Sequence, residues 1–162
     1  MADRYSILFV CMGNICRSPS AENVMRTVAE REGVTEMLEL DSAGTIDFHT
    51  GKSPDPRMTE AAEKRGIDMI GSARQVQRSD FGKFHLILAM DDENMADLLR
   101  WKKQHGGKAK LKMFCDFCGD NEGVTEVPDP YYGGPEGFEL VLDLLEDGCS
   151  EIAKQVKVNT LE

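Results

Sequence analysis

Apolar residues along the chain follow two patterns, one typical of buried strands and one typical of amphipathic helices. Residues 5–10 are almost continuously apolar and rich in β-branched and aromatic side chains, as expected of a strand covered on both faces of a parallel sheet. Residues 84–90 repeat this pattern. Shorter strands are predicted over residues 37–41 and 108–114, so the sheet should contain about four strands.

Segments with apolar residues at helical spacing lie between and after these strands. In the first of them Ser18 is predicted to cap the helix and Pro19 to occupy its first turn, and Gly33 ends it. In the last one a single apolar stripe extends from Phe138 to Val156. Two further helices are predicted over about 57–65 and from Asp91 to Gly106.

The alternation of strands and helices predicts a small doubly wound α/β sheet of about four parallel strands with helices on both faces. No internal repeat divides the chain, so residues 1–162 are predicted to form one domain. Residues 115–135 lack periodicity and are predicted to be a loop. Ligands of such sheets bind beyond the carboxyl ends of the strands. The loops of interest therefore follow Val10, Asp41, Met90 and Phe114.

Composition and charge narrow the classes of partner. The chain has 162 residues, of which 41% are hydrophobic and 30% charged, as in ordinary globular proteins. Nineteen basic and 29 acidic residues give a net charge of −10, which disfavours nucleic acid and anionic membrane surfaces. The first residues lack the pattern of a secretory signal, and no apolar run could span a bilayer. We therefore expect a cytoplasmic protein, with a monomer as the working expectation.

The loop after the first strand carries the candidate chemistry. Residues 11–18 read Cys-Met-Gly-Asn-Ile-Cys-Arg-Ser, and a helix follows directly. Backbone N–H groups around such a loop, the freedom of Gly13 and the positive end of the helix favour binding of a phosphate. Arg17 can hold two oxygens of a tetrahedral anion, and Cys11 at the floor should be favoured as a thiolate that faces phosphorus. The other predicted phosphate-binding residues are Met12, Asn14, Ile15, Cys16 and Ser18.

Residues 10–19 closely resemble the signature of the low-molecular-weight protein tyrosine phosphatases. Other landmarks of that family follow in the family's order across nearly the whole chain, at residues 41–44, 53–57, 73–76, 89–91 and 129–133. The resemblance implies hydrolysis of phosphotyrosine in proteins, or of other aryl phosphate monoesters, through a cysteinyl-phosphate intermediate. It also implies that no metal or cofactor takes part.

By this resemblance Cys11 is the nucleophile, Arg17 holds the phosphate, Ser18 steadies the thiolate and Asp129 is the general acid. The role of Asp129 also makes chemical sense, because phenolate is a poor leaving group with a conjugate acid of pKa about 10. A positioned carboxylic acid should protonate the phenolate and later deprotonate the attacking water. Pro130 stiffens the loop that presents this acid.

Asn14 and Ser42 resemble the polar residues that hold the loop in shape in this family, where Asn also tolerates the left-handed conformation. Asp91, at a strand end, is predicted either to brace Arg17 or to cap the following helix.

The cleft is predicted to have aromatic walls. Phe48, Tyr131 and Tyr132 are candidates for a flat slot that receives the substrate ring, with simple packing as the alternative for each. Phe48 stands where the family often has a larger aromatic residue, which leaves the substrate preference open.

Five cysteines without dense spacing indicate reduced thiols. By the resemblance Cys16 is the partner of Cys11 in a reversible disulfide; the alternative is a small buried residue. Cys115 and Cys118 form a lone Cys-x2-Cys, which suggests half a zinc site or a redox pair. A closed zinc site needs four ligands, and neither Cys149 nor the histidines show matching spacing.

Two further functions stay open at this point. Arsenate reductases of the same fold relay oxidation through additional cysteines, but no cysteine lies between Cys16 and Cys115. A phosphocysteine carrier would have no need of Asp129 as an acid. A phosphotyrosine-binding protein without activity is disfavoured, because nucleophile, phosphate-holding arginine and acid are all present.

Overall fold

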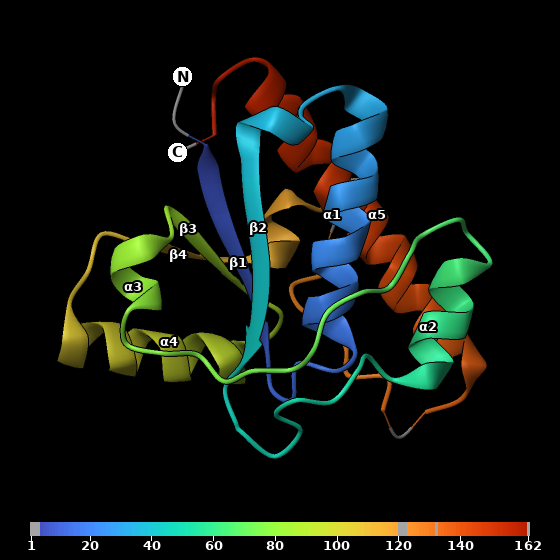
Figure 1. The fold of residues 1–162 in the computed structure, drawn as a ribbon, viewed down its shortest axis with the longest axis horizontal. Helices are drawn as coiled ribbons and strands as arrows, with labels where there is room; N and C mark the ends of the chain where they lie inside the picture. The colour runs from blue at the N-terminus through green and yellow to red at the C-terminus, as the bar shows by residue number, and fades with distance from the viewer. Residues whose placement is uncertain (1–3, 120–122, 132, 162) are drawn as a thin grey trace.

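The computed structural model of the protein describes residues 4–119, 123–131 and 133–161. At its centre is a sheet of four parallel strands in the order β2-β1-β3-β4 (Figure 1). The strands are β1 (Tyr5–Cys11), β2 (Leu38–Gly44), β3 (Leu86–Ala89) and β4 (Lys110–Met113). The prediction of a small parallel α/β sheet is confirmed.

The strand order turns at β1, which has β2 on one side and β3, followed by β4, on the other. At such a switch point the connections leave in opposite directions and open a crevice above the carboxyl ends of the strands. Cys11 is the last residue of β1. The fold therefore places this cysteine at the mouth of the crevice.

Helices cover both faces of the sheet, as predicted. One face carries α1 (Arg17–Glu32) and α5 (Pro135–Lys157), the other carries α3 (Asp80–Lys83) and α4 (Asp92–His105), and α2 (Pro56–Glu63) packs on α5 (Figure 1). Among the described residues no helix combines the length and the apolar character needed to cross a bilayer.

Side chains of β1 alternate between the two hydrophobic layers. Ile7 and Phe9 pack with α1 and α5, whereas Leu8 and Val10 pack with α3 and α4. All four side chains are fully buried. Because both faces of β1 are covered, the strand has little freedom to move. The loop that leaves its end is held with it.

The structure corrects the predicted start of α1. Its N-cap residue is Cys16, with no side-chain cap hydrogen bond, and Ser18 lies inside the first turn. The Ser18 hydroxyl instead faces the sulfur of Cys11, 3.0 Å away. The tight turn of the loop brings this hydroxyl to the sulfur, so it does not cap the helix. Gly33 ends α1 as predicted, in a left-handed conformation with φ 74°.

Several short elements differ from the sequence prediction. The helix α3 and the 3-10 turns η1 (Thr35–Met37) and η2 (Phe114–Phe117) have too few residues for a recognisable period. The turn η2 extends into the segment predicted as a loop. Strand β2 continues to Gly44, beyond the predicted end at residue 41, because its last residues still pair with β1.

Gly148 of α5 allows a close approach that generates a prediction. A Cβ at this position would lie well inside the contact distance of Cζ of Phe114, whose ring is fully buried. Gly→Ala in a helix interior ordinarily stabilises a protein by up to about 1 kcal/mol. Here Gly148→Ala should instead lower the free energy of unfolding by about 1–3 kcal/mol through overpacking, measured by chemical denaturation.

The matched control for this prediction is Gly137→Ala in the same helix. Its Cβ would meet Pro130 at an ordinary 3.6 Å, so the control should not destabilise. A Gly148→Ala protein as stable as the control would contradict the close packing of α5 on Phe114.

Candidate active site

The loop between β1 and α1 wraps around the sulfur of Cys11. Two backbone N–H groups point at this Sγ, from Asn14 at 3.3 Å and from Ser18 at 3.4 Å, and the Ser18 Oγ lies 3.0 Å from it. Cys11 is only 2% exposed. The N-terminus of the 16-residue helix α1 also lies at this loop and adds positive potential. Amide donors and the helix end together favour negative charge on the sulfur.

The sharp bend of the loop depends on Asn14. Its φ of 56° lies in the left-handed region, which asparagine tolerates better than most residues. Its side-chain Nδ2 donates to the Ser18 Oγ at 2.7 Å. Gly13, expected to supply the unusual conformation, does not have a positive φ. A Cβ there would instead lie 3.0 Å from the ring of His49, so Gly13 leaves room for that ring.

Arg17 is buried beneath the cleft, with its guanidinium already held. Nη1 donates to Asp91 Oδ2 at 2.6 Å and to the carbonyl oxygen of Val127 at 3.2 Å. Burial alone would lower the pKa of Arg17, but the negative charge at Cys11 and the hydrogen bond to Asp91 outweigh it and raise the pKa above its ordinary value. Arg17 therefore stays charged in the site.

Asp91 makes both of the contacts that the sequence left as alternatives. One carboxylate oxygen accepts from Arg17, and the other accepts from the backbone N–H of Asn94 at 2.8 Å. The second contact makes Asp91 the N-cap of α4. One side chain thus joins the start of α4 to the buried guanidinium of Arg17.

Asp129 lies across the cleft from the loop. Its Oδ2 is 3.6 Å from Arg17 Nη2, and its Oδ1 accepts from the backbone N–H of Tyr131 at 3.0 Å. The carboxylate is about one-third exposed, with a relative accessibility of 36%. It can therefore meet both a leaving group in the cleft and an incoming water.

The cleft above the loop has a volume of about 190 Å³ and is walled by aromatic and apolar side chains. Phe48 and Tyr131 line it, as the sequence analysis expected, together with Ile46 and His49. The His49 ring meets Phe48 edge-on at 4.9 Å. Tyr132 lies outside the described residues. The loop residues Met12, Gly13, Ile15 and Cys16 complete the lining, with Cys11, Arg17 and Asp129.

Ser42 contacts the site less directly than expected. Its hydroxyl donates to Glu22 of α1 at 2.8 Å. The two residues after it approach the loop more closely: the carbonyl of Ala43 accepts from the Ser18 hydroxyl at 3.4 Å, and a Cβ on Gly44 would lie 2.7 Å from the Met12 carbonyl oxygen. Gly44 therefore lets the loop sit directly on the end of β2, a role that the sequence analysis did not identify.

Cys16 is the second thiol of the cleft. Burial, followed by the charge of Asp55, raises the pKa of the Cys16 thiol far above its ordinary value, so it stays protonated. Cys115 and Cys118 are not among the residues that line the cleft and belong to the hydrophobic layer under α5. Within the described parts of the chain, no three His, Cys, Asp or Glu side chains lie together as a metal site would require.

The comparison with known proteins agrees with this geometry. The sequence profile of the low molecular weight phosphotyrosine protein phosphatases matches residues 6–161. A Synechocystis sp. protein assigned to the low molecular weight protein-tyrosine-phosphatases is 50% identical over 146 residues, which cover 90% of this chain and 92% of its own.

Solved structures show the same relationship. A crystal structure of protein tyrosine phosphatase from Entamoeba histolytica, with Hepes in the active site, has 42% identity and a TM-score of 0.88, covering 97% of this chain and 99% of its own. The crystal structure of Drosophila arginine phosphatase has 25% identity and a TM-score of 0.88, and the match covers 93% of this chain and 97% of the Drosophila chain. The family profile covers residues 6–161, and the Entamoeba histolytica phosphatase shares the fold at 42% identity. The chain therefore belongs to the low molecular weight phosphotyrosine protein phosphatase family and hydrolyses phosphotyrosine.

Proposed function

We propose that Cys11 attacks the phosphorus of a phosphotyrosine side chain and forms a cysteinyl-phosphate. The Sγ–P bond forms as the bond between phosphorus and the phenolic oxygen breaks. The observation that carries this proposal is the set of donors that converge on the Cys11 sulfur, in the same cleft as Arg17 and Asp129. Arg17 is held by Asp91 before any substrate arrives, so it needs little reorganisation to bind the phosphoryl oxygens.

Asp129 is proposed as the general acid of the first step and the general base of the second. It gives its proton to the leaving phenolate and later takes a proton from water, whose oxygen attacks phosphorus. The sulfur then leaves as a thiolate, and inorganic phosphate is the product. The place of Asp129 in the cleft, 3.6 Å from Arg17, supports this assignment.

The walls of the cleft favour aryl phosphates as substrates. Phe48 and Tyr131 offer flat apolar surface to a phenyl ring. A phosphoserine side chain is too short to fill a cleft whose anion site lies at the buried floor, where Cys11 is only 2% exposed. Phosphotyrosine should therefore be preferred to phosphoserine.

The alternatives lack comparable support. A phosphocysteine carrier would need no carboxylate at the position of Asp129. A thiol relay for arsenate reduction would need further cysteines at the cleft, and Cys115 and Cys118 are not among its lining residues.

We further propose that residues 1–162 act as one domain and as a monomer, because one chain supplies nucleophile, arginine and acid. We also propose that the protein works in the cytoplasm, where its free thiols stay reduced.

Replacing the nucleophile tests the central proposal. Cys11→Ser should abolish phosphate release from a phosphotyrosine peptide in the presence of a chelator, because a serine hydroxyl is not ionised at neutral pH. Binding of vanadate or phosphate should survive, since the amides and Arg17 remain. The native protein should release phosphate in multiple turnovers; a single equivalent would favour the carrier. Full activity of Cys11→Ser would refute the assignment.

A leaving-group series tests the acid. General acid catalysis contributes about 10²–10⁴-fold, so Asp129→Ala should lose roughly that factor in kcat/KM with phosphotyrosine. The loss should shrink for aryl phosphates whose phenols are more acidic, because these leave without a proton. The slope of log kcat/KM against phenol acidity measures this effect. The same loss across the whole series would count against Asp129 as the acid.

The two thiols of the cleft predict reversible oxidation. Peroxide oxidises the Cys11 thiolate to a sulfenic acid, and the protonated Cys16 thiol then displaces its hydroxyl as water and forms a disulfide. Activity lost to mild peroxide should return with dithiothreitol in the native protein and far less in Cys16→Ser. Cys115→Ser is the control and should recover like the native protein. A disulfide between Cys11 and either Cys115 or Cys118, found by peptide mapping, would contradict the pairing of Cys11 with Cys16.

A further inference from the structure

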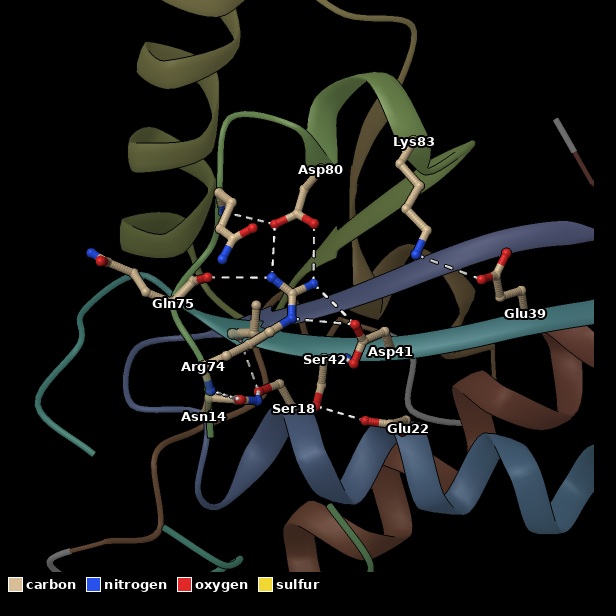
Figure 2. A network of polar contacts seen from close by, with 12 residues as sticks. Asn14, Ser18, Glu22, Glu39, Asp41, Ser42, Arg74, Gln75, Asp80 and Lys83 are labelled. Atoms are coloured by element: carbon tan, nitrogen blue, oxygen red, sulfur yellow. Dashed lines mark hydrogen bonds and ion pairs between the residues drawn. The ribbon is translucent and has the colours of Figure 1, made fainter. Parts of the chain in front are cut away.

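The side chain of Asn14 is held from outside the phosphate-binding loop. Its Oδ1 accepts a hydrogen bond from the backbone N–H of Arg74 at 3.0 Å, and its Nδ2 donates to the Ser18 hydroxyl at 2.7 Å (Figure 2). That hydroxyl lies 3.0 Å from the sulfur of Cys11. Three consecutive contacts therefore connect residue 74 to the nucleophile.

These contacts have a fixed direction. A backbone N–H can only donate, so it keeps the oxygen of the Asn14 amide on its own side and turns the NH₂ group towards Ser18. The Ser18 oxygen then accepts from Asn14, and its own proton has two acceptors in reach, the Cys11 sulfur at 3.0 Å and the carbonyl of Ala43 at 3.4 Å. The sulfur is the nearer one, and when charged it is the stronger acceptor. A hydroxyl that donates to sulfur stabilises the thiolate, whereas one that accepts from a thiol does not. The orientation of the Asn14 amide thus occupies the Ser18 oxygen as an acceptor and leaves the Ser18 proton available to Cys11.

The backbone at Arg74 has only a short attachment of its own to the sheet. Its carbonyl accepts from the N–H of Gly44 at 2.8 Å, and the N–H of Val76 donates to the Gly44 carbonyl at 2.8 Å. A single isolated bridge, Gly44 with Gln75, is formed there. On its other side the neighbouring Ala73 donates to the Lys52 carbonyl and accepts from the Gly51 N–H, both at 2.8 Å. These are contacts with a loop and not with a continuous strand ladder, so the segment gains from any further restraint.

The side chain of Arg74 adds such a restraint. Its guanidinium lies between two carboxylates, with Nη2 3.0 Å from Asp41 Oδ2 and 3.1 Å from Asp80 Oδ1, and Nη1 3.0 Å from Asp80 Oδ2 (Figure 2). Asp80 is nearly fully buried and also accepts from the N–H of Gln77 at 2.7 Å. The guanidinium therefore ties segment 73–76 to both β2 and the start of α3.

The charge balance makes this arrangement sensitive to loss of the arginine. Two carboxylates face one guanidinium, and burial keeps water from screening Asp80. Without the guanidinium, Asp80 would be left as a buried charge that keeps the hydrogen bond from the N–H of Gln77, so we expect the segment to shift. The backbone N–H of residue 74 would move with it.

We propose that Arg74 is a positioning residue for the nucleophile: by holding its own backbone N–H against Asn14, it directs the Ser18 proton to the Cys11 sulfur. The proposal rests on the assignment of Cys11 as nucleophile. It differs from a purely structural role because it predicts an effect on the ionisation of one thiol, beyond any effect on folding.

The test measures the rate of Cys11 alkylation by iodoacetamide as a function of pH, with peptide mapping to separate the five cysteines. A hydrogen bond to a charged group is worth about a tenfold change in equilibrium, so in Arg74→Met the pH of half-maximal alkylation should rise by about one unit. kcat for an aryl phosphate at neutral pH should fall about tenfold. The other titratable groups that face Cys11 from the cleft lining are the same in every variant, namely Arg17, Cys16, His49, Asp129 and Tyr131.

The matched control is Arg65→Met. Arg65, just after α2, also joins several carboxylates of α5, namely Glu139, Asp143 and Glu146. Within the described part of the chain, the side-chain hydrogen bonds and ion pairs of Arg65 are all with α5 and none is with residues 11–18. Both variants should lose thermal stability, while only Arg74→Met should shift the pH of alkylation. An unshifted pH of alkylation in a folded Arg74→Met protein would overturn the proposal.

A milder substitution keeps the test decisive if Arg74→Met folds poorly. Asp80→Asn preserves shape but weakens the hold on Arg74, and it should shift the alkylation in the same direction by less; no shift in this variant would also count against the proposal. Alkylation needs no turnover. Failure of Cys11 as nucleophile would therefore appear as activity in Cys11→Ser, separately from any failure at Arg74.

Discussion

The convergence of hydrogen-bond donors on one sulfur atom is the constraint on which the rest of the structure depends. Two amides and a hydroxyl reach the sulfur of Cys11 only because the chain turns from strand to helix within a few residues. That turn requires the left-handed conformation of Asn14. A loop so bent would relax if it were free, so its neighbours have to hold it.

The two strands beside β1 provide much of this support, each through the residue at or just beyond its carboxyl end. β2 ends in Gly44, whose lack of a side chain lets the loop rest on the strand. β3 is followed, after Met90, by Asp91, which holds Arg17. The topology thus places a glycine without a side chain on one side of Cys11 and a carboxylate on the other. A parallel sheet with a switch point at β1 delivers both to the same edge.

Much of this arrangement is readable from the sequence, because strands, helices and the phosphate-binding loop are local patterns. The carbonyl of Val127 that accepts from Arg17 and the N–H of Arg74 that donates to Asn14 are backbone groups. All residues have the first and all but proline have the second, so no sequence motif marks them. The expected cap at Ser18 was wrong for a related reason. Local preference favours a cap there, but a contact with the sulfur uses the hydroxyl instead.

The double role of Asp91 has a consequence for how this protein can vary. Its two oxygens serve different tasks, one on the amide of Asn94 and one on the guanidinium of Arg17. Serine or threonine could begin α4 equally well but would leave the arginine without its counter-charge. Glutamate would keep the charge but hold it one methylene further from the helix. The choice of amino acid at this position is therefore narrower than either task alone would demand. A substitution that alters how α4 begins also alters the partner of the Arg17 guanidinium in the cleft.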